Sequence, residues 1–291
     1  MIFLDGFICV DKPTGPSSFS AAQAARRSLK ISKAGHAGTL DPMASGLLVV
    51  ALGRCTRLLE HLSLEPKIYE FSVTFGKSTD TLDAEGGVVA ESDIVPSADR
   101  LAGALKNFMG AITQIPPRYS AIKINGTPAY KLARRGVDVE MKSRTVNIYG
   151  LDMCGYDAGA GRADFTVSCS SGTYIRSLAI DILKAADAGA EGFVNRLRRT
   201  RTGRFDLSMA VDYQHLPDAI NYIINAGDAF DDSQKVTLCD TQKEEISKGR
   251  KVVINNTGPG DVLIAFDRDG VLSAVLKRVD AGLYHPEKVF L

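Results

Sequence analysis

The sequence predicts an α+β protein, and three observations lead to this fold class. Segments with strand-like and helix-like patterns alternate irregularly along the 291 residues. Turn residues join neighbouring strands directly, and Asn125-Gly126 is the strongest hairpin signal among them. From residue 233 onward, short strands follow one another closely with Gly, Pro, Asn and Asp between them. Irregular alternation with hairpins favours α+β over a doubly wound parallel sheet.

The N-terminal region opens with a strand and a capped helix. A short apolar run predicts a strand over Gly6–Val10, and the Pro/Gly/Ser cluster after it predicts a turn. Ser17 or Ser18 can cap a helix over residues 19–30. The glycine-rich loop that follows leads into an apolar run over 47–52, which predicts a buried strand.

The middle of the chain predicts further strands and helices in mixed order. A short helix is expected over 56–62 and a strand over 68–76, with alternate residues on one face. The polar stretch 77–87 is expected to be a loop, and a Ser/Asp cap begins a helix over 97–109. The stretch 163–186 then predicts a strand, a tight Ser-Gly turn and a helix.

The sequence pattern changes near residue 233, from which point short strands predominate. A helix is expected over 215–227, inside an acidic stretch. Beyond it, four short strands are expected over 235–240, 251–255, 261–267 and 270–279. We therefore expect two domains, a large one over residues 1–232 and a small β-rich one over 233–291.

The composition excludes several classes of protein. No run of about 18 apolar residues is present, so no membrane span is expected. The N-terminus does not have the pattern of a signal peptide. The five cysteines are scattered and form no CxxC pair, which argues against disulfides and zinc and for the cytoplasm. GxxxxGK[ST], HExxH and GxSxG are all missing, so the chemistry is expected to use ordinary side chains without cofactor or metal.

The net charge is only +1, but the charges are unevenly distributed. The stretch Arg196–Arg204 has five arginines and no acid, whereas Asp206–Asp232 has six aspartates and no lysine or arginine. This asymmetry indicates a basic working face, or else an ordinary solvated charged face. If it is a working face, this run and the basic segment Arg118–Arg144 are candidate phosphate contacts, with salt-sensitive binding.

Four residues are candidates for chemistry, although each also has a purely structural interpretation. Asp41 lies in "GHAGTLDPMASG", where Pro42 favours an extended or turn backbone and the glycines allow close approach of a ligand. Asp41 could equally be a turn or capping aspartate. Tyr69 and Tyr174 could be core aromatics, and Arg176 a surface arginine.

Taken together, these segments resemble the TruB-type tRNA pseudouridine synthases. The motif "GHAGTLDPMASGLL" matches the signature of that family. The stretches "VDKPTGPSS", "KIYEFSVTFGKSTDTLDAEG", "IPPRYSAIKINGTPAYKLAR" and "CSSGTYIRSLAIDI" follow in the order and spacing of the family. The segment from about Lys235 is similar to the small PUA-type RNA-binding domain of bacterial members. The resemblance is strong through residue 205 and weaker beyond it.

The resemblance implies a fold and a set of site residues. The catalytic domain is expected to hold a mixed, largely antiparallel sheet flanked by helices and loops, and the C-terminal domain to be PUA-like. Asp41 matches the catalytic nucleophile, Tyr69 the tyrosine that stacks on the flipped base and takes part in proton transfer, and Arg176 the arginine paired with the carboxylate. The resemblance further implies substrate or RNA contacts for His36, Tyr174, Leu197, Arg57 and Lys12, the last through the Lys12-Pro13 motif that supports the catalytic loop.

The resemblance also implies an activity: isomerisation of uridine to pseudouridine at position 55 in the T loop of tRNA, an intramolecular transfer by an isomerase. The base would be flipped out of its stack, because no group can reach it inside folded RNA. The ionised carboxylate would need a guanidinium beside it, since burial alone raises its pKa. No cofactor, obligatory protein partner or guide RNA is expected. Whether Asp41 attacks C6 of uracil or C1′ of ribose is left open.

Two other functions remain open at this point. One is an RNA-binding or tRNA-folding module that needs no catalysis, for which basic stretches and a PUA-like tail would suffice. The other is that of the guide-RNA-dependent relatives of archaea and eukaryotes, which depend on partner proteins. Only the enzyme needs Asp41, Tyr69 and Arg176 together, and no extension like those of the guide-dependent relatives is apparent.

Overall fold

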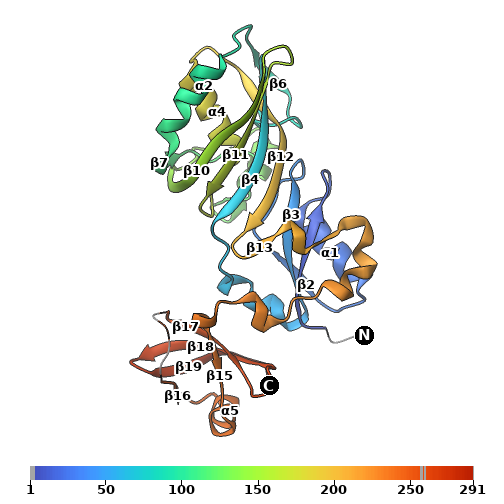
Figure 1. Ribbon diagram of the computed structural model, residues 1–291, viewed down its shortest axis with the longest axis vertical. Coiled ribbons are helices and arrows are strands. Elements are labelled where there is room, and N and C mark those ends of the chain that lie inside the picture. Colours follow the sequence, from blue (N-terminus) through green and yellow to red (C-terminus); the bar gives the residue numbers. More distant parts are fainter. Residues whose placement is uncertain (1–3, 256–257, 259, 291) are drawn as a thin grey trace.

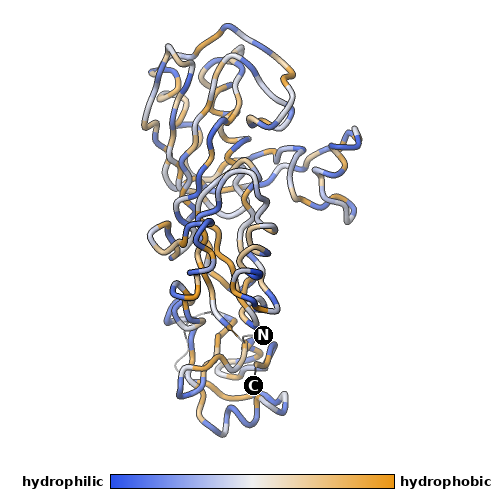
Figure 2. The backbone as a smooth tube through the Cα atoms, turned by 90° about the vertical axis from the view of Figure 1, so that its right-hand side faces the viewer, coloured by the Kyte–Doolittle hydropathy of each residue, from blue (hydrophilic) through white to orange (hydrophobic). Residues whose placement is uncertain are grey.

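The computed structural model describes residues 4–255, 258 and 260–290, which form an elongated molecule built around two sheets (Figure 1). The larger sheet occupies the upper and middle parts of the view, and the smaller one the lower part. Figure 2 shows hydrophobic stretches through the middle of the molecule and both marked termini toward one end.

The larger sheet has ten strands within the described residues and runs in the order β14-β1-β3-β12-β4-β11-β10-β7. Two further strands, β2 and β13, pair at β3 and β12. The pairs β1–β14 and β3–β12 are parallel and the others are antiparallel, so the expected α+β fold with a mixed, largely antiparallel sheet is confirmed. Its strands are β1 (Gly6–Lys12), β2 (Ala34–Ala37), β3 (Ser45–Leu52), β4 (Lys67–Phe75), β7 (Gly110–Gln114), β10 (Arg144–Asp157), β11 (Arg162–Cys169), β12 (Gly192–Thr202), β13 (Phe205–Asp206) and β14 (Ala210–Asp212).

Helices cover this sheet and bury its apolar faces. The helices on this sheet are α1 (Ser18–Ser28), α2 (Ala98–Leu105) and α4 (Ile175–Ala186). Helix α3 (Ala129–Ala133) lies away from it, and α5 (Asp240–Ser247) packs on the C-terminal sheet. Ser17 caps α1 by accepting a hydrogen bond from the Ser20 amide, as the sequence predicts. Helices α2 and α4 lie side by side on one face (Figure 1), where Leu178 and Ile182 join a core with Phe71 and Phe165. Burial of these side chains holds α4, and therefore Arg176 at its start, rigidly against the sheet.

The C-terminal sheet has five strands in the part of the chain that the structure describes, in the order β15-β17-β18-β19-β16. Its strands are β15 (Lys235–Thr237), β16 (Val252–Val253), β17 (Val262–Phe266), β18 (Leu272–Asp280) and β19 (Leu283–Val289). Phe266, Leu272 and Phe290 pack in one hydrophobic core with Phe7 and Phe230. The small sheet is therefore joined to the larger part through a shared apolar core.

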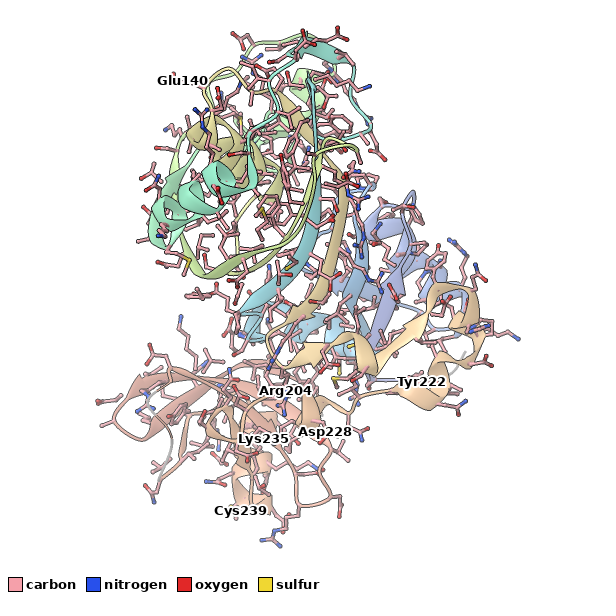
Figure 3. All side chains as sticks on the ribbon, turned by 45° about the horizontal axis from the view of Figure 1, so that its top comes forward. Glu140, Arg204, Tyr222, Asp228, Lys235 and Cys239 are labelled. Atoms are coloured by element: carbon pink, nitrogen blue, oxygen red, sulfur yellow. The ribbon has the colours of Figure 1, made fainter. Side chains whose placement is uncertain are left out.

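Polar contacts reinforce the junction between the two sheets. Figure 3 shows Arg204, Asp228 and Lys235 where the larger part meets the smaller sheet. Arg204 Nη1 donates to the Phe230 carbonyl at 2.6 Å. Lys235 Nζ donates to the carbonyl of Gly227 at 3.0 Å. Because both acceptors are backbone groups, these contacts fix the path of the connecting chain.

Some of the sequence-based expectations about elements are wrong. The short helix expected over 56–62 is present as the 3₁₀ helix η1 (Gly53–His61). The helix expected over 215–227, in contrast, is replaced by the 3₁₀ helices η4 (Tyr213–Tyr222) and η5 (Ala226–Ala229). Pro217 lies inside η4 and His215 departs from helical geometry, which breaks the expected α-helix. The polar stretch expected as a loop contains β5 (Lys77–Thr79), paired with β6 (Val88–Glu91).

Smaller elements complete the fold. The hairpin expected at Asn125-Gly126 is present as β8 (Lys123–Ile124) and β9 (Thr127–Pro128). Both turn residues have positive φ, 48° and 82°, as a type I′ turn requires. The remaining 3₁₀ helices are η2 (Lys106–Phe108), η3 (Leu207–Met209) and η6 (Asp232–Gln234).

Candidate active site

Asp41 lies in the loop between β2 and β3, and two glycines shape that loop. Gly38 and Gly46 have φ values of +66° and +99°, in the region that favours glycine. A Cβ on Gly46 would overlap the backbone of Arg199, because β3 and β12 approach closely there. A side chain at this position would push the strands apart, so the sharp entry into β3 depends on glycine.

The side chain of Lys12 connects the same loop to the segment that follows β1. Its Nζ donates to the carbonyls of Pro13 and Pro16, both at 2.8 Å, and of Pro42 at 3.3 Å. The side chain has no exposed surface, and burial lowers the pKa of its ammonium to about 8. These contacts agree with the expected support of the catalytic loop by Lys12, whereas a direct contact of the buried ammonium with RNA stays a prediction.

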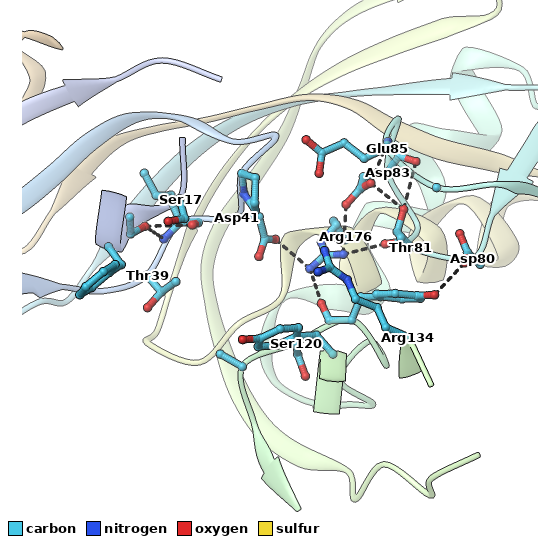
Figure 4. Close-up of a pocket in the computed structure, with 18 of the residues that line it drawn as sticks. Ser17, Thr39, Asp41, Asp80, Thr81, Asp83, Glu85, Ser120, Arg134 and Arg176 are labelled. Carbon is cyan, nitrogen blue, oxygen red and sulfur yellow. Dashed lines mark hydrogen bonds and ion pairs between the residues drawn. The ribbon is translucent and has the colours of Figure 1, made fainter. Parts of the chain in front are cut away.

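The side chain of Arg176 binds Asp41 and three other groups. Its Nη2 lies 2.8 Å from Asp41 Oδ2 and donates to the Tyr119 carbonyl at 2.9 Å. Its Nη1 lies 3.1 Å from Asp83 Oδ2 and donates to the Thr81 carbonyl at 2.7 Å. Figure 4 shows the guanidinium between the two carboxylates. The expected pairing of Asp41 with Arg176 is thus present, and the planar fork fixes the direction of the Asp41 carboxylate.

Asp83 is a site residue that the sequence did not reveal. Its carboxylate is almost fully buried, accepts hydrogen bonds from the Thr81 hydroxyl at 2.6 Å and the Glu85 amide at 3.0 Å, and pairs with Arg176. It lies 42 positions from Asp41 in a stretch that looks like an ordinary polar loop. The only indication of its role in the sequence was its position in "KSTDTLDAEG", which is part of one of the stretches that carry the family resemblance.

Opposing effects set the pKa of Asp41. Desolvation raises it above the ordinary aspartate value, and the charge of Asp83 raises it further. The guanidinium of Arg176 and the ammonium of Lys12 oppose this rise, and the net result is a raised pKa. Arg176 therefore holds the carboxylate in place, but burial makes its ionised form less stable than it would be in water.

The sign of these shifts predicts a pH dependence. If Asp41 reacts as a carboxylate, kcat/KM falls as pH decreases through its raised pKa, so the acid limb lies above the ordinary aspartate range. Replacing Asp83 by asparagine removes a like charge, which lowers the pKa of Asp41. We therefore expect Asp83→Asn to move the acid limb of the kcat/KM profile toward lower pH.

Glu85 provides the control for this measurement. Burial and the charges of Asp83 and Asp41 raise the pKa of Glu85, so Glu85 also titrates in acid. Because Asp83, and not Glu85, is among the main influences on the pKa of Asp41, Glu85→Gln should move the limb clearly less than Asp83→Asn if the limb reports Asp41. A limb that follows Glu85→Gln instead, or that moves upward in Asp83→Asn, would contradict the assignment.

Asp41 separates two connected pockets. The smaller has a volume of about 210 Å³ and contains most of the expected residues, since Tyr69, Tyr174, Arg176 and Leu197 line it together with Asp41. The larger has a volume of about 910 Å³, opens to the surface and includes His36 and the exposed ring of Phe19. Burial raises the pKa of the Tyr69 hydroxyl, and the positive charge of Arg199 opposes this.

Arg57 is not brought to this site. It lies in η1, where Nη1 donates to the Val289 carbonyl at 3.0 Å and the guanidinium lies 4.5 Å from the centre of the Phe290 ring. It lines neither pocket around Asp41. The expectation of a site contact at Arg57 is corrected by this placement: the residue ties η1 to the C-terminal strand.

The arginine run does not form one basic face. It lies in β12 and the turn after it, where Arg199 is completely buried and Arg198 pairs with Asp11 at 2.6 Å. The charged lining of the larger pocket contains four carboxylates and two arginines: Asp41, Asp80, Asp83, Glu85, Arg134 and Arg176. Carboxylates therefore outnumber cations in this pocket, and Arg118–Arg144, which contributes Arg134 to the lining, remains a candidate segment for phosphate contacts.

The described residues form neither a metal site nor a membrane-spanning helix. No group of three or more His, Cys, Asp or Glu side chains in the described ranges is arranged to hold a metal ion. No helix formed by those residues is long and apolar enough to cross a membrane.

Comparison with known proteins places the chain among RNA-modifying proteins. The model of the TruB family pseudouridylate synthases, N terminal domain, matches residues 26–175. The tRNA pseudouridine synthase B of Caulobacter sp. (strain K31) is 36% identical, with 99% of this chain and 96% of that protein covered. The protein of the same name from Ehrlichia chaffeensis is 38% identical over 86% of this chain and 87% of its own length.

Solved structures agree with this placement. A Cbf5-Nop10-Gar1 complex contains a chain with 25% identity and a TM-score of 0.72, covering 98% of this chain and 85% of its own. The archaeal box H/ACA sRNP Nop10-Cbf5 complex gives 26% identity, a TM-score of 0.70, and coverage of 98% and 86%.

Proposed function

This chain belongs to the TruB family of pseudouridylate synthases, and from that premise we propose that it isomerises uridine to pseudouridine at position 55 in the T loop of tRNA. The observation that carries the proposal is the Asp41–Arg176 pair, 2.8 Å apart, between a surface pocket and a small inner pocket that contains Tyr69. A reactive carboxylate at the mouth of a base-sized recess suits a flipped nucleotide.

We assign roles to the residues that line the inner pocket. Asp41 is the nucleophile, and Arg176 keeps its carboxylate ionised and aimed. Tyr69 stacks on the flipped uracil and takes part in proton transfer, while Tyr174 and Leu197 form the walls against which the base packs. His36, at the outer pocket, contacts the RNA next to the target nucleotide.

The reaction needs no external reagent. Breaking the bond between N1 and C1′ and forming one between C5 and C1′ leaves the composition of the nucleotide unchanged, apart from moving one proton from C5 to N1. No electrons enter or leave, so the proposal includes no cofactor. The same balance holds whether Asp41 attacks C6 of uracil or C1′ of ribose.

The domain division is part of the proposal. We assign catalysis to residues 1–232 and a PUA-like RNA-binding role to residues 233–291, whose sheet begins at Lys235. The solved structures contain Cbf5 in complexes with Nop10, in one case also with Gar1, whereas we propose that this chain acts alone on tRNA. Its small sheet would add contact area beyond the pocket, where the carboxylates leave little attraction for phosphate.

An assay with purified components tests the proposal. The purified chain is incubated with unmodified tRNA transcript, and pseudouridine is mapped at single-nucleotide resolution. We expect modification at uridine 55 and none in a transcript with cytidine at that position. Binding of tRNA without pseudouridine formation would support an RNA-folding module, and dependence on an added guide RNA would support the guide-dependent function; either result overturns the proposal.

A further inference from the structure

Two buried cations lie beside the inner pocket, and the assigned roles use neither of them. Lys67 begins β4, and Arg199 lies on the adjacent strand β12, opposite Tyr69 in the strand register. Lys67 and Tyr69 are two residues apart, so their side chains share one face of β4. Lys67 lines the inner pocket with Asp41 and Tyr69 although only 8% of its surface is exposed.

Gly38 of the Asp41 loop brings the two cations together. A Cβ on Gly38 would lie 3.1 Å from Arg199 Nη1 and 3.5 Å from Lys67 Nζ. Both groups therefore lie against the same point of the backbone, three residues before Asp41. A side chain at Gly38 would crowd both cations, which is a second reason, beside its φ of +66°, for glycine there.

The protein supplies little negative charge to balance this pair. Arg199 donates from Nε to the Leu47 carbonyl and from Nη2 to the Gly38 carbonyl, both at 2.8 Å, but both acceptors are neutral. For Lys67, no hydrogen bond or ion pair is found among the residues that the structure describes. Cys169 and Glu65 both attract Lys67. Burial raises the pKa of the Cys169 thiol to about 11, so this thiol is mostly neutral at pH 7. The Glu65 carboxylate accepts hydrogen bonds from the Ser171 amide at 2.9 Å and the Tyr149 hydroxyl at 3.1 Å.

A buried charge without a partner is unfavourable, which lowers the pKa of Lys67. Such an arrangement persists when a ligand or a transition state provides the missing charge. The proposed reaction provides it inside this pocket. When N1–C1′ breaks, the electron pair stays on uracil and spreads over N1, O2 and O4. Attack at C6 likewise places negative charge on the ring, at O4.

We propose that Lys67 is a further catalytic residue, whose ammonium stabilises the negative charge that develops on uracil as the bond between N1 and C1′ breaks. The proposal rests on the proposed function. Arg199 is a positioning residue that fixes the Gly38 and Leu47 carbonyls. The negative charge on uracil disappears when C5 bonds to C1′, and the proton on C5 then leaves while N1 is protonated. Lys67 therefore acts only between cleavage of the bond between N1 and C1′ and formation of the bond between C5 and C1′.

The test compares two leaving groups. T-arm RNA carries either uridine or 5-fluorouridine at the target position, and bond rearrangement is followed under single-turnover conditions. Fluorine withdraws electrons and stabilises the uracil anion, so the fluorinated base depends less on the lysine. For Lys67→Met we expect kcat with uridine to fall by about 100-fold, the scale of removing one preorganised donor. The loss with 5-fluorouridine should be clearly smaller.

Three further arms keep the outcome interpretable. Lys67→Arg keeps the charge and should recover part of the rate, and Lys106→Met removes an exposed lysine outside both pockets and should have no effect. Thermal unfolding checks folding, and Lys67→Gln replaces Lys67→Met if that variant is unfolded. Because an unpaired buried charge is removed, we expect the Tm of Lys67→Met to equal or exceed that of the wild type.

Specific results would overturn the inference. Equal losses with the two bases would show that Lys67 does not act on the departing uracil. A raised KM with unchanged kcat would make Lys67 a binding contact, for example to a phosphate. Absence of pseudouridine with the wild-type chain would instead refute the proposed function, so the two failures can be told apart.

Discussion

Replacing Asp41 by asparagine is expected to lower pseudouridine formation by more than ~10⁴-fold, the scale seen when a nucleophile is removed. Asparagine has nearly the shape of aspartate, so the loop between β2 and β3 keeps its path, but the neutral amide cannot attack uracil or ribose. Pseudouridine is measured in tRNA under single-turnover conditions, with the purified variant in excess over the RNA.

Folding and RNA binding should survive this change. The pKa of Asp41 is raised in the folded chain, so its ionised carboxylate destabilises the fold at neutral pH, and asparagine removes that effect. Arg176 keeps its pair with Asp83. We therefore expect a Tm at pH 7 no lower than that of the wild type and an unchanged Kd for tRNA.

The matched control for Asp41→Asn is Asp187→Asn. Asp187 also pairs with an arginine, Arg100, at 2.6 Å, but this pair lies outside both pockets. The activity of Asp187→Asn should remain at the wild-type level. Wild-type pseudouridine formation by Asp41→Asn would remove Asp41 from the mechanism and would leave the two pockets without an assigned nucleophile.

The sequence predicted the parts of this molecule whose signals are local. The strand over Gly6–Val10, the Ser17 cap and the Asn125-Gly126 turn each depend on a few neighbouring residues, and all three are present. Asp41 and Arg176 were placed together through a family resemblance, because no local rule connects residues 135 positions apart.

Features set by distant contacts could not be predicted in this way. The resemblance implied that Lys12 supports the catalytic loop, but no local pattern predicted the three carbonyls from two separate segments that enclose its ammonium. Arg199 looked like part of a basic patch, because lysine and arginine are rarely buried completely. Its burial depends on carbonyls of β3 and of the Asp41 loop, which lie more than 150 positions away. The sequence shows how many charged side chains are present, but it does not show which groups each of them contacts.

The largest combined effect on stability and rate is expected at Arg176. Replacement by lysine keeps one positive charge but loses the planar fork that now binds two carboxylates and two carbonyls. An ammonium cannot contact all four groups in the same geometry. Only 3% of the Arg176 side chain is exposed, so water cannot replace the lost contacts, and Asp83 would be left with a buried and poorly paired charge.

We expect Arg176→Lys to lower the free energy of unfolding by about 3 kcal/mol, the lower end for breaking a buried ion pair. The rate should fall by roughly 10²- to 10³-fold, because the carboxylate of Asp41 is no longer aimed at the base. Urea unfolding gives the first number and single-turnover rates at saturating tRNA give the second. The loss should appear in kcat, since the arginine contacts the proposed nucleophile.

Arg100→Lys is the matched control, because Arg100 forms the same type of pair with Asp187 but is 63% exposed. Exposed pairs contribute little, so we expect its free energy of unfolding to change by no more than ~0.5 kcal/mol and its rate to stay constant. If Arg176→Lys retained the wild-type kcat, a point charge alone would suffice to hold Asp41, and the fork geometry would have no part in catalysis. If it lost stability but not rate, Arg176 would be a structural link between Asp83 and the Tyr119 segment. Only a joint loss supports an arginine that both builds the site and orients the carboxylate.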